Sequence, residues 1–387
     1  MNKRKNILWL ASWYPNNNDA FDGDFIQRQA RAASLYNDIH VIYVTDTEIK
    51  TSREEIINSS TGLTEQIIYF KKKTGLLSRL QKQLRWRQLF YTATEDYITK
   101  YGKPDVVHVH IPWKTGLIAL RLKNKYGLDF IVSEHWGIYN NSIKDNFASK
   151  PAVIKGIIKK VFSEAKHFIS VSKYLAEGIR KEVTEKEYTV IENVVDTSLF
   201  YYKEQKYSRF SFIHVSNMAP LKNISKILKA FSHLITSGAD DVQLVLVGNR
   251  NHQYKQEAEE LGLLNKSVFF RGEISYVDVA KEMQLSHAMI LFSETETFSC
   301  VTAEALCCGL PVVARKTGAL PELINETNGI LVDSANENDL VAALLQMKNN
   351  YQLFDQKMIS EKARKEFDYA TIGQKLQALY SNPVFHS

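Results

Sequence analysis

Two kinds of hydrophobic pattern alternate along almost the whole chain. Short runs rich in Val, Ile, Leu and Phe predict buried strands, and longer stretches with hydrophobic positions three and four residues apart predict amphipathic helices. In the first half, strands are predicted at NILWLAS, IHVIYVT, DVVHVH, DFIVSEH, HFISVS and YTVIENV, and helices near 24–36, 76–100, 114–126, 151–165 and 172–183. Because strands that alternate with helices are typical of βαβ units, we expect a parallel sheet.

The same alternation then starts again. Strands are predicted at FSFIHVS, VQLVLVG, SVFFRG, AMILFS and PVVAR, with helices near 223–237, 252–263, 276–286 and 301–309. The polar stretch YYKEQKYSR at 201–209 lacks hydrophobic periodicity and is the expected linker. We therefore predict two Rossmann-like α/β domains, at 1–200 and 210–365, that face each other across a deep cleft.

Composition narrows the class of protein further. Hydrophobic residues make up 44% and charged residues 24% of the 387 residues, as in packed globular proteins. The apolar runs are too short to cross a bilayer and the first residues lack a signal-peptide pattern, so a cytoplasmic location is expected. The three cysteines, Cys300, Cys307 and Cys308, lie in one short stretch, which favours reduced thiols over disulfides and predicts no metal site.

The positive charge is concentrated in the first half of the chain. Lys and Arg outnumber Asp and Glu by 30 to 22 in residues 1–200, against 19 to 21 in the remainder. The densest segment, KKKTGLLSRLQKQLRWRQLF at 71–90, sets cations around Leu and Trp at helical spacing. Two interpretations stay open for it: contact with the anionic inner face of a membrane, or the solvated face of a helix packed on the core. No nucleic-acid recognition motif accompanies the charge, so nucleic-acid binding is not expected.

The stretch SETETFSCVTAEALCCGLPVV at 293–313 carries candidate chemistry. Glu296 falls in a predicted loop, where folding does not require an acid. Glu304 falls about one turn inside a short helix, where a carboxylate stabilises the helix dipole by only about 0.3–1 kcal/mol. A carboxylate can also accept two hydrogen bonds from neighbouring sugar hydroxyls. Lys222 lies in a loop that opens a helix, which suits a phosphate contact as well as an ordinary surface position.

This stretch resembles the Glu-x7-Glu motif of the retaining, nucleotide-sugar-dependent glycosyltransferases of family 4, which have the GT-B fold. The positions in register are Glu296, Phe298, Glu304, Ala305, Gly309, Pro311, Val312 and Val313. The resemblance implies that Glu304 binds the donor ribose and that Glu296 contacts the donor sugar. It also implies that the donor diphosphate meets the intervening segment, at Ser299, Cys300, Val301 and Thr302.

Further segments are similar to family segments in the same order: IENVVDTSLF, VSNMAPLKN, VFFRGEIS and KTGALPELINETNGILVD. Lys222 matches the family's diphosphate-binding Lys, whereas Asn217 stands where Arg is usual. The backbone around Glu273 and Ile274 is implied to contact the nucleobase. Residues 366–387, with the helical pattern IGQKLQALY, are implied to return to the first domain.

The first half resembles the family less specifically. Gly23 is the candidate for a close backbone approach to the donor phosphates, although an ordinary turn glycine fits equally well. His135, directly after a predicted strand, is implied to lie near the donor sugar. His108 and His110 are expected to be hydrogen-bonded wall residues of the domain. Aromatic side chains near strand ends are candidates for stacking on the acceptor sugar or for core packing: Trp13, Tyr14, Trp113 and Trp136.

The resemblance implies sugar transfer from a nucleoside diphosphate sugar, with a UDP-sugar as the expected donor, to a glycan or lipid-linked acceptor in cell-surface polysaccharide or glycoconjugate synthesis. His135, Glu296 and Lys222 are the expected catalytic residues, and the donor is a co-substrate with no cofactor. Two other classes stay open: a non-catalytic nucleotide- or glycan-binding member of a polysaccharide assembly complex, and a nucleotide-sugar epimerase. Asn217, together with Thr297 and Ser299 in place of two motif glycines, favours the non-catalytic class modestly.

Overall fold

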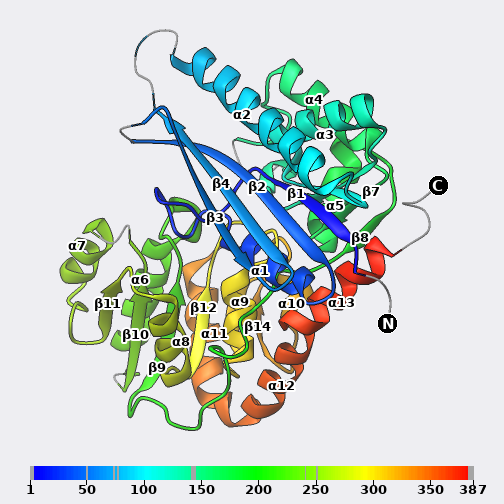
Figure 1. Ribbon diagram of the computed structural model, residues 1–387. Helices are drawn as coiled ribbons and strands as arrows, with labels where there is room; N and C mark the ends of the chain where they lie inside the picture. Colours follow the sequence, from blue (N-terminus) through cyan, green and yellow to red (C-terminus); the bar gives the residue numbers. More distant parts are fainter. Residues whose placement is uncertain are drawn as a thin grey trace. The chain divides into compact units, whose positions relative to one another are not determined.

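The computed structural model describes residues 4–48, 51–72, 75, 78–140, 145–239, 241–249 and 252–381. The chain divides into two compact units (Figure 1). Unit 1 comprises Met1–Val194 with Tyr369–Ser387, and unit 2 comprises Val195–Asp368. Each unit is an α/β domain built on its own sheet, as the alternating pattern predicts. No helix in the described part of the chain has the length and hydrophobicity needed to cross a membrane.

Unit 1 is built on an eight-stranded sheet of order β3-β4-β2-β1-β5-β6-β7-β8 within the described residues. The strands are β1 (Asn6–Ala11), β2 (Asp38–Thr47), β3 (Arg53–Ser60), β4 (Leu63–Lys71), β5 (Val106–His110), β6 (Phe130–Glu134), β7 (His167–Ser170) and β8 (Tyr188–Val190). The accompanying helices are α1 (Asp24–Ser34), α2 (Ser78–Tyr101), α3 (Pro112–Tyr126), η1 (Gly137–Tyr139), α4 (Ala152–Glu164), α5 (Lys173–Glu182) and α13 (Tyr369–Tyr380). Central strands such as β5 are buried along their whole length because helices cover both faces of a parallel sheet.

The expectation of a wholly parallel sheet is wrong at the edge formed by β3. This strand pairs antiparallel with β4 through a tight turn at Gly62, whose φ of 75° is left-handed and suits glycine. The sequence pattern missed both strands. The β3 sequence REEIINSS is largely exposed and offers no hydrophobic run to recognise.

The last helix, α13, belongs to unit 1 and packs on α1. Gly373 permits this packing, since a Cβ there would clash with the backbone carbonyl oxygen of Ala32. The Lys375 ammonium lies 2.6 Å from a Glu192 carboxylate oxygen, and the Tyr380 hydroxyl lies 2.7 Å from Nδ1 of His108. The chain therefore crosses between the units twice, after Val194 and after Asp368.

Unit 2 contains a parallel six-stranded sheet of order β11-β10-β9-β12-β13-β14 in its described residues. The strands are β9 (Phe210–Val215), β10 (Val242–Val247), β11 (Val268–Gly272), β12 (Ala288–Leu291), β13 (Val312–Arg315) and β14 (Gly329–Val332). The helices are η2 (Pro220–Lys222), α6 (Ile224–Thr236), α7 (His252–Glu260), α8 (Tyr276–Leu285), α9 (Cys300–Cys307), α10 (Leu320–Leu323), α11 (Glu337–Asn350), η3 (Tyr351–Leu353) and α12 (Gln356–Phe367).

The segment 201–209, expected as the linker, lies within unit 2. Its Lys206 ammonium donates to the Gln284 carbonyl oxygen at 3.0 Å, and the Tyr207 amide donates to the Leu285 carbonyl oxygen at 2.8 Å. These bonds attach the polar segment to the end of α8. A polar sequence without periodicity therefore marks an irregular stretch here, while the crossing itself occurs a few residues earlier, at Val194–Val195.

Candidate functional site

Glu296 and Lys222 meet in unit 2. The Lys222 ammonium lies 2.6 Å from a Glu296 carboxylate oxygen, and their side chains are only 16% and 11% exposed. The residues are far apart in the sequence, but parallel β9 and β12 are neighbours in the sheet, so the loops after them converge at the same edge. The two residues therefore form a well-shielded ion pair at the carboxyl ends of these strands.

The loop that carries Glu296 is fixed from both sides. The Glu294 amide donates to the Leu221 carbonyl oxygen at 2.8 Å, and the Ala319 amide donates to the Glu296 carbonyl oxygen at 2.9 Å. Gly318 has a left-handed φ of 56°, and a Cβ there would lie 2.7 Å from the Glu296 backbone nitrogen. Glycine is required at 318 because the two backbones approach so closely. These contacts hold the Glu296 backbone in one place, and the Lys222 ammonium contacts its carboxylate.

Helix α9 starts immediately after this loop. Its first residue, Cys300, follows Ser299, whose φ of 75° is left-handed. The Ser299 and Thr302 hydroxyl oxygens lie 2.8 Å apart. The start of a helix carries partial positive charge that suits a phosphate. The Thr302 amide itself donates to the Ser299 carbonyl oxygen at 3.1 Å. Val301 lies in the same turn and is half-buried, whereas Thr302 is buried.

Glu304 lies inside α9 and is 2% exposed. A carboxylate oxygen of Glu304 accepts a hydrogen bond from the Tyr276 hydroxyl. Tyr276 begins α8 and packs edge-on against Phe200, with ring centroids 5.0 Å apart. It follows the Glu273–Ile274 segment by two residues, which brings that segment and Glu304 to the same region of unit 2. Sequence reasoning did not single out Tyr276, because nothing in its spacing distinguishes it from a helix-start aromatic residue.

The Asn217 side chain forms a hydrogen bond within its own loop. Its side-chain oxygen accepts a hydrogen bond from the Ala219 amide at 3.1 Å, which stabilises the turn between β9 and η2. The residue is exposed and carries no charge. Lys222 is therefore the cation that this loop brings to Glu296.

In unit 1, His135 follows β6 and is buried against two other rings. Its ring stacks on His110, with centroids 5.8 Å apart, and packs at a tilt against Phe25, with centroids 4.9 Å apart. Burial lowers the pKa of His135 to about 3, although the Asn193 side chain acts in the opposite direction. The imidazole is therefore neutral near pH 7.

Glu134, which sequence reasoning did not select, shapes the His135 loop. One carboxylate oxygen accepts hydrogen bonds from the His135 and Trp136 amides, both at 2.9 Å, and the other accepts from the Tyr139 hydroxyl at 2.6 Å. Burial raises the pKa of Glu134 to about 7, although these three donors favour the charged form. Sequence reasoning could have selected Glu134 because it is an acidic residue in a strand that is buried along its whole length.

The two histidines of β5 differ from each other. Both His108 ring nitrogens have partners, the Tyr380 hydroxyl and the Ser133 hydroxyl, each at 2.7 Å. The expectation of a hydrogen-bonded wall residue is met at His108. It is wrong at His110, whose fully buried ring has no hydrogen-bond partner among the described residues and packs on Trp9 at 4.0 Å. Burial lowers the pKa of both rings far below the usual value.

The proposed acceptor aromatics separate into two groups. Trp13 contacts Trp136 edge-on at 6.2 Å and is partly exposed, as is Trp136. Trp113, in the first turn of α3, is also half-buried. Tyr14 must be corrected: its ring is fully buried and its hydroxyl donates to a Glu65 carboxylate oxygen at 2.6 Å. A core ring with no exposed face does not stack on a sugar.

Gly23 precedes α1 with a left-handed φ of 65°. A Cβ there would lie 2.6 Å from the Trp13 carbonyl carbon, so the close approach of these two backbone segments requires glycine. This contact accounts for Gly23 as a turn residue.

Comparison with known proteins covers most of the chain. Residues 31–199 match the family model described as Glycosyltransferase Family 4, and residues 203–366 match the model described as Glycosyl transferases group 1. The chain belongs to the family 4 glycosyltransferases.

Two curated relatives illustrate the match. An uncharacterized glycosyltransferase of Methanocaldococcus jannaschii is 27% identical over 64% of this chain and 67% of its own length. N-acetyl-alpha-D-glucosaminyl L-malate synthase of Bacillus anthracis is 27% identical over 43% of both chains. The similarity to the second relative thus spans less than half of that protein.

Solved structures agree on the GT-B fold. Sucrose-phosphate synthase from Thermosynechococcus elongatus matches with a TM-score of 0.80 and 19% identity over 99% of this chain and 100% of that chain. HepE from Anabaena in complex with UDP-glucose has a TM-score of 0.69 at 17% identity, covering 97% and 99% of the two chains. Starch synthase IV from Arabidopsis thaliana, bound to ADP and acarbose, has a TM-score of 0.72 at 15% identity, covering 99% and 100%. At these identities the likeness shows the fold alone.

The backbone explains one departure of this glycosyltransferase from the family motif. Ser299 occupies the second glycine position of the motif, and its left-handed conformation costs a non-glycine residue about 1–2 kcal/mol. The hydroxyl contact with Thr302 offsets part of that cost. The loop therefore keeps a glycine-like conformation without the glycine.

The glycosyltransferase's cysteines are free thiols. Burial raises the pKa of the Cys307 and Cys308 thiols well above the usual value, so both are protonated. Cys300 is partly exposed at the start of α9. Among the described residues, no group of three or more His, Cys, Asp or Glu side chains is arranged to hold a metal ion.

Proposed function

We propose that this protein transfers a glycosyl group from a nucleoside diphosphate sugar to a sugar hydroxyl, with retention of the anomeric configuration. The observation that supports this most strongly is the shielded Lys222–Glu296 pair beside the first turn of α9. A departing diphosphate needs positive charge, and a sugar needs hydrogen-bond acceptors for its hydroxyls. The Lys222–Glu296 pair and the first turn of α9 supply positive charge and hydrogen-bond acceptors at one place.

In the proposed donor complex, the diphosphate replaces Glu296 as the partner of the Lys222 ammonium. The freed Glu296 carboxylate accepts hydrogen bonds from donor-sugar hydroxyls, and Glu304 accepts them from the ribose. Amides of residues 299–302 bind the phosphate oxygens. The backbone at Glu273 and Ile274 contacts the nucleobase. Asn217 contributes a neutral side chain to the same loop.

The proposed reaction breaks the bond between the anomeric carbon and the diphosphate oxygen. A new bond forms from the acceptor oxygen to the same face of that carbon, and the acceptor's proton passes to the leaving phosphate oxygen. Lys222 stabilises the negative charge that develops on the diphosphate. His135, neutral near pH 7, orients the donor sugar and does not act as a nucleophile.

We further propose a UDP-sugar as donor and a glycan or lipid-linked sugar as acceptor, in cytoplasmic synthesis of cell-surface polysaccharide or glycoconjugate. HepE, which shares the fold, was solved with UDP-glucose, whereas starch synthase IV was solved with ADP. The nucleobase of this protein's donor is therefore best identified with a panel of nucleotide sugars. Trp13, Trp113 and Trp136 are the proposed acceptor-stacking residues, since each keeps part of its side chain exposed.

Metal independence follows from this proposal as a prediction. Because Lys222 and the helix amides neutralise the diphosphate, we expect EDTA to change turnover by less than twofold. The measurement is nucleoside diphosphate release before and after chelation and dialysis. A loss of activity that added Mg²⁺ or Mn²⁺ restores would contradict the prediction, because a metal would then supply the charge.

Tyr276 provides a test of the ribose role of Glu304. The Tyr276→Phe change removes the hydroxyl that donates to Glu304, so the carboxylate loses an orienting hydrogen bond. We expect nucleotide affinity to fall about fivefold, in line with one hydrogen bond of about 1 kcal/mol. Calorimetric titration with the preferred nucleoside diphosphate measures this change.

Tyr207→Phe is the matched control for that titration. Its hydroxyl donates to a Glu282 carboxylate oxygen at 2.8 Å, so it removes a similar phenol–carboxylate bond in unit 2. We expect its nucleotide affinity to stay within twofold of the wild type. Equal affinities of the two variants would show that Tyr276 does not orient a ribose-binding carboxylate.

The main experiment measures transfer with a panel of UDP-, GDP- and ADP-sugars and a set of sugar acceptors. A transferase releases nucleoside diphosphate and forms a larger glycan in equal amounts. A nucleotide-sugar epimerase changes the donor without an acceptor, and a non-catalytic binding protein leaves the donor intact. Product analysis therefore separates the three classes.

A further inference from the structure

Strand β3 forms a long, exposed edge of the unit 1 sheet. Its eight residues stand at one end of the strand order and pair with β4 on one side only. The other edge strands of the two described sheets, β8, β11 and β14, have three, five and four residues. The outer side of β3 therefore presents a row of backbone amides and carbonyls that have no strand partner among the described residues.

The features that usually protect an edge strand are absent from β3. The strand contains no proline and no lysine, and its register with β4 runs through eight consecutive residue pairs without a bulge. The Arg53 guanidinium lies 2.6 Å from a Glu55 carboxylate oxygen, so these two charges offset each other and Glu54 carries the remaining charge. An edge of this length and low net charge is suited to pairing with another strand.

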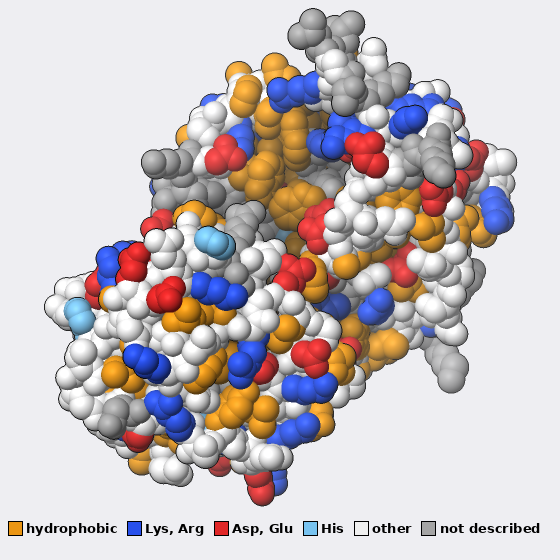
Figure 2. Space-filling view, turned by 90° about the vertical axis from the view of Figure 1, so that its left-hand side faces the viewer, with side chains coloured by type: hydrophobic (Ala, Val, Ile, Leu, Met, Phe, Trp, Pro, Cys, Tyr) orange, Lys and Arg blue, Asp and Glu red, His pale blue; other side chains and the backbone are white. Residues whose placement is uncertain are grey.

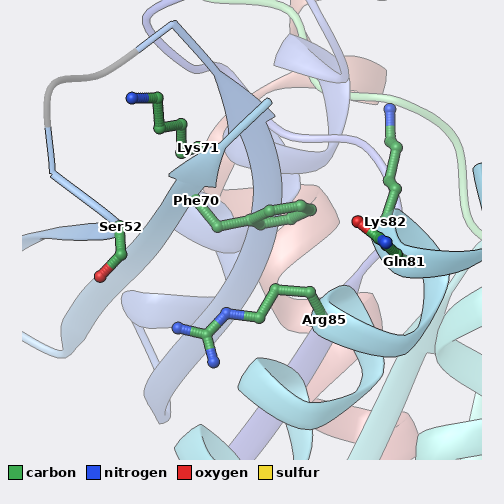
Figure 3. A pocket seen from close by; sticks show the side chains of 6 residues that line it. All are labelled: Ser52, Phe70, Lys71, Gln81, Lys82 and Arg85. Carbon is green, nitrogen blue, oxygen red and sulfur yellow. The ribbon is translucent and has the colours of Figure 1, made fainter. Parts of the chain in front are cut away.

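One face of the β3–β4 hairpin is open beside this edge. Ile57 lies opposite Gln66 of β4 and is 59% exposed, whereas its neighbour Ile56 points to the other face and packs on the unit 1 core. Helix α2 faces the Ile57 side but leaves a pocket of about 380 Å³ between itself and the hairpin (Figure 3). The pocket is lined by Ser52, Phe70, Lys71, Gln81, Lys82 and Arg85. An exposed isoleucine thus stands on an open face next to a free strand edge.

Two-fold symmetry limits how two copies of β3 can pair. In an antiparallel pair related by a two-fold axis, each face of the sheet continues across the axis, so the central residue meets its own copy. Centring the pair on Ile57 sets that residue against itself and each glutamate against a serine: Glu54 with Ser60, and Glu55 with Ser59. The serine hydroxyls can donate hydrogen bonds to the carboxylates, and the two isoleucines bury each other. The strand is therefore complementary to itself in this register.

The charges also favour this register over its neighbours. The two Glu54 carboxylates are about 20 Å apart along the paired strands, well beyond the screening length of physiological salt. Centring the pair on Ile56 instead would set the exposed Ile57 against Glu55. Centring it on Asn58 would set Ile57 against a serine and Glu54 against the turn glycine, Gly62. Both alternatives lose the contact between the two isoleucines.

We propose that two copies of this chain form a reversible dimer by antiparallel pairing of their β3 strands, centred on Ile57. The pairing joins the two unit 1 sheets into one continuous sheet. A second copy is favoured over a different protein because β3 is complementary to itself. One strand from each copy makes a small interface, so the dimer should form in the micromolar range. The dimer is separate from the proposed sugar transfer, because it uses no residue proposed to bind donor or acceptor.

The test is sedimentation equilibrium of the full-length protein from low to high micromolar concentration. The average mass of the wild type should rise from that of one chain toward that of two. I57K and I57D should each raise the dissociation constant at least tenfold, because like charges then meet across the axis with Cβ atoms about 5 Å apart. An equimolar mixture of the two variants should associate within threefold of the wild type, because unlike charges meet in the mixed dimer.

Leu84 provides a matched control in unit 1. Exposed hydrophobic side chains also gather elsewhere on the molecule, as Figure 2 shows near the upper end of its view. Leu84 is 56% exposed, and the buried residues of α2 begin only at Leu89, so L84K makes the same kind of change at a similar surface position. Its dissociation constant should stay within twofold of the wild type. All three variants should keep the wild-type melting temperature, because both substituted side chains lie outside the core.

Three results would overturn the proposal. One is a wild-type chain that stays monomeric at every concentration. Another is an equimolar mixture of I57K and I57D that associates no better than either variant alone, since the two residues would then not meet at a two-fold axis. The third is a dimer that L84K dissociates and I57K leaves intact, which would assign the contact to α2.

Discussion

Replacing Glu296 by glutamine, or Lys222 by alanine, lowers turnover at least tenfold while the chain stays folded. Glu296→Gln removes the negative charge that orients the donor sugar, but it keeps an oxygen that can accept from the Lys222 ammonium, 2.6 Å away in the wild type. Lys222→Ala removes the cation that stabilises the leaving diphosphate. Removal of a single transition-state contact of this kind costs about 10²–10³ in turnover in well-studied enzymes, so tenfold is a conservative lower limit.

Two nearby substitutions serve as controls for these variants. Glu294→Gln changes an exposed carboxylate in the same loop, and Lys229→Ala removes an exposed lysine from the helix after Lys222. Both should keep turnover within twofold. Lys222→Ala leaves Glu296 shielded without its partner, which lowers stability, so turnover is measured well below the melting temperature of each variant. Near wild-type turnover in both Glu296→Gln and Lys222→Ala would defeat the catalytic assignment.

The second large effect concerns Glu304. UDP at a hundredfold excess over its dissociation constant stabilises a protein that binds it only when folded by about 2.7 kcal/mol. We expect one of UDP, GDP and ADP to raise the melting temperature of the wild type by several degrees. In Glu304→Ala that rise should disappear, because the ribose loses its carboxylate. Thermal unfolding with each nucleotide and with buffer alone measures both effects.

Glu304→Ala also removes the acceptor of the Tyr276 hydroxyl, so its melting temperature without ligand is the necessary reference. Glu304→Gln, which keeps the volume of the side chain, separates the loss of charge from the loss of packing. If a nucleotide stabilises Glu304→Ala as much as the wild type, the ribose role is wrong. If no nucleotide stabilises the wild type, the neutral Asn217 has weakened the donor site and the non-catalytic class is favoured.

Sequence reasoning selected the central residues of the proposed donor site but not their contacts. Glu296, Glu304 and Lys222 came from motif spacing and from positions after strands, where parallel sheets gather ligands. The ion pair between Lys222 and Glu296 depends on how the loops after two neighbouring strands bend, which no local pattern reports. Tyr276 and Glu134 were missed for the same reason, since both act through residues that lie close only in the folded chain.

The fold was predictable where burial was strong. Strands such as β5 and β9 are buried along nearly their whole length because helices cover both faces of the sheet. The edge strand β3 faces solvent and therefore lacks that signal. Tyr14 illustrates the opposite error: an aromatic residue after a strand suits a binding surface or a core, and only the structure shows its hydroxyl paired with Glu65 inside unit 1.

We propose that unit 2 binds a nucleoside diphosphate sugar and that its sugar moves to an acceptor with retention. The most direct measurement is NMR of the products formed from UDP-, GDP- and ADP-sugars with a panel of glycan acceptors. We expect one donor whose sugar appears on an acceptor with its anomeric configuration unchanged, together with an equal amount of nucleoside diphosphate. An inverted linkage, or an altered donor formed without any acceptor, would contradict it.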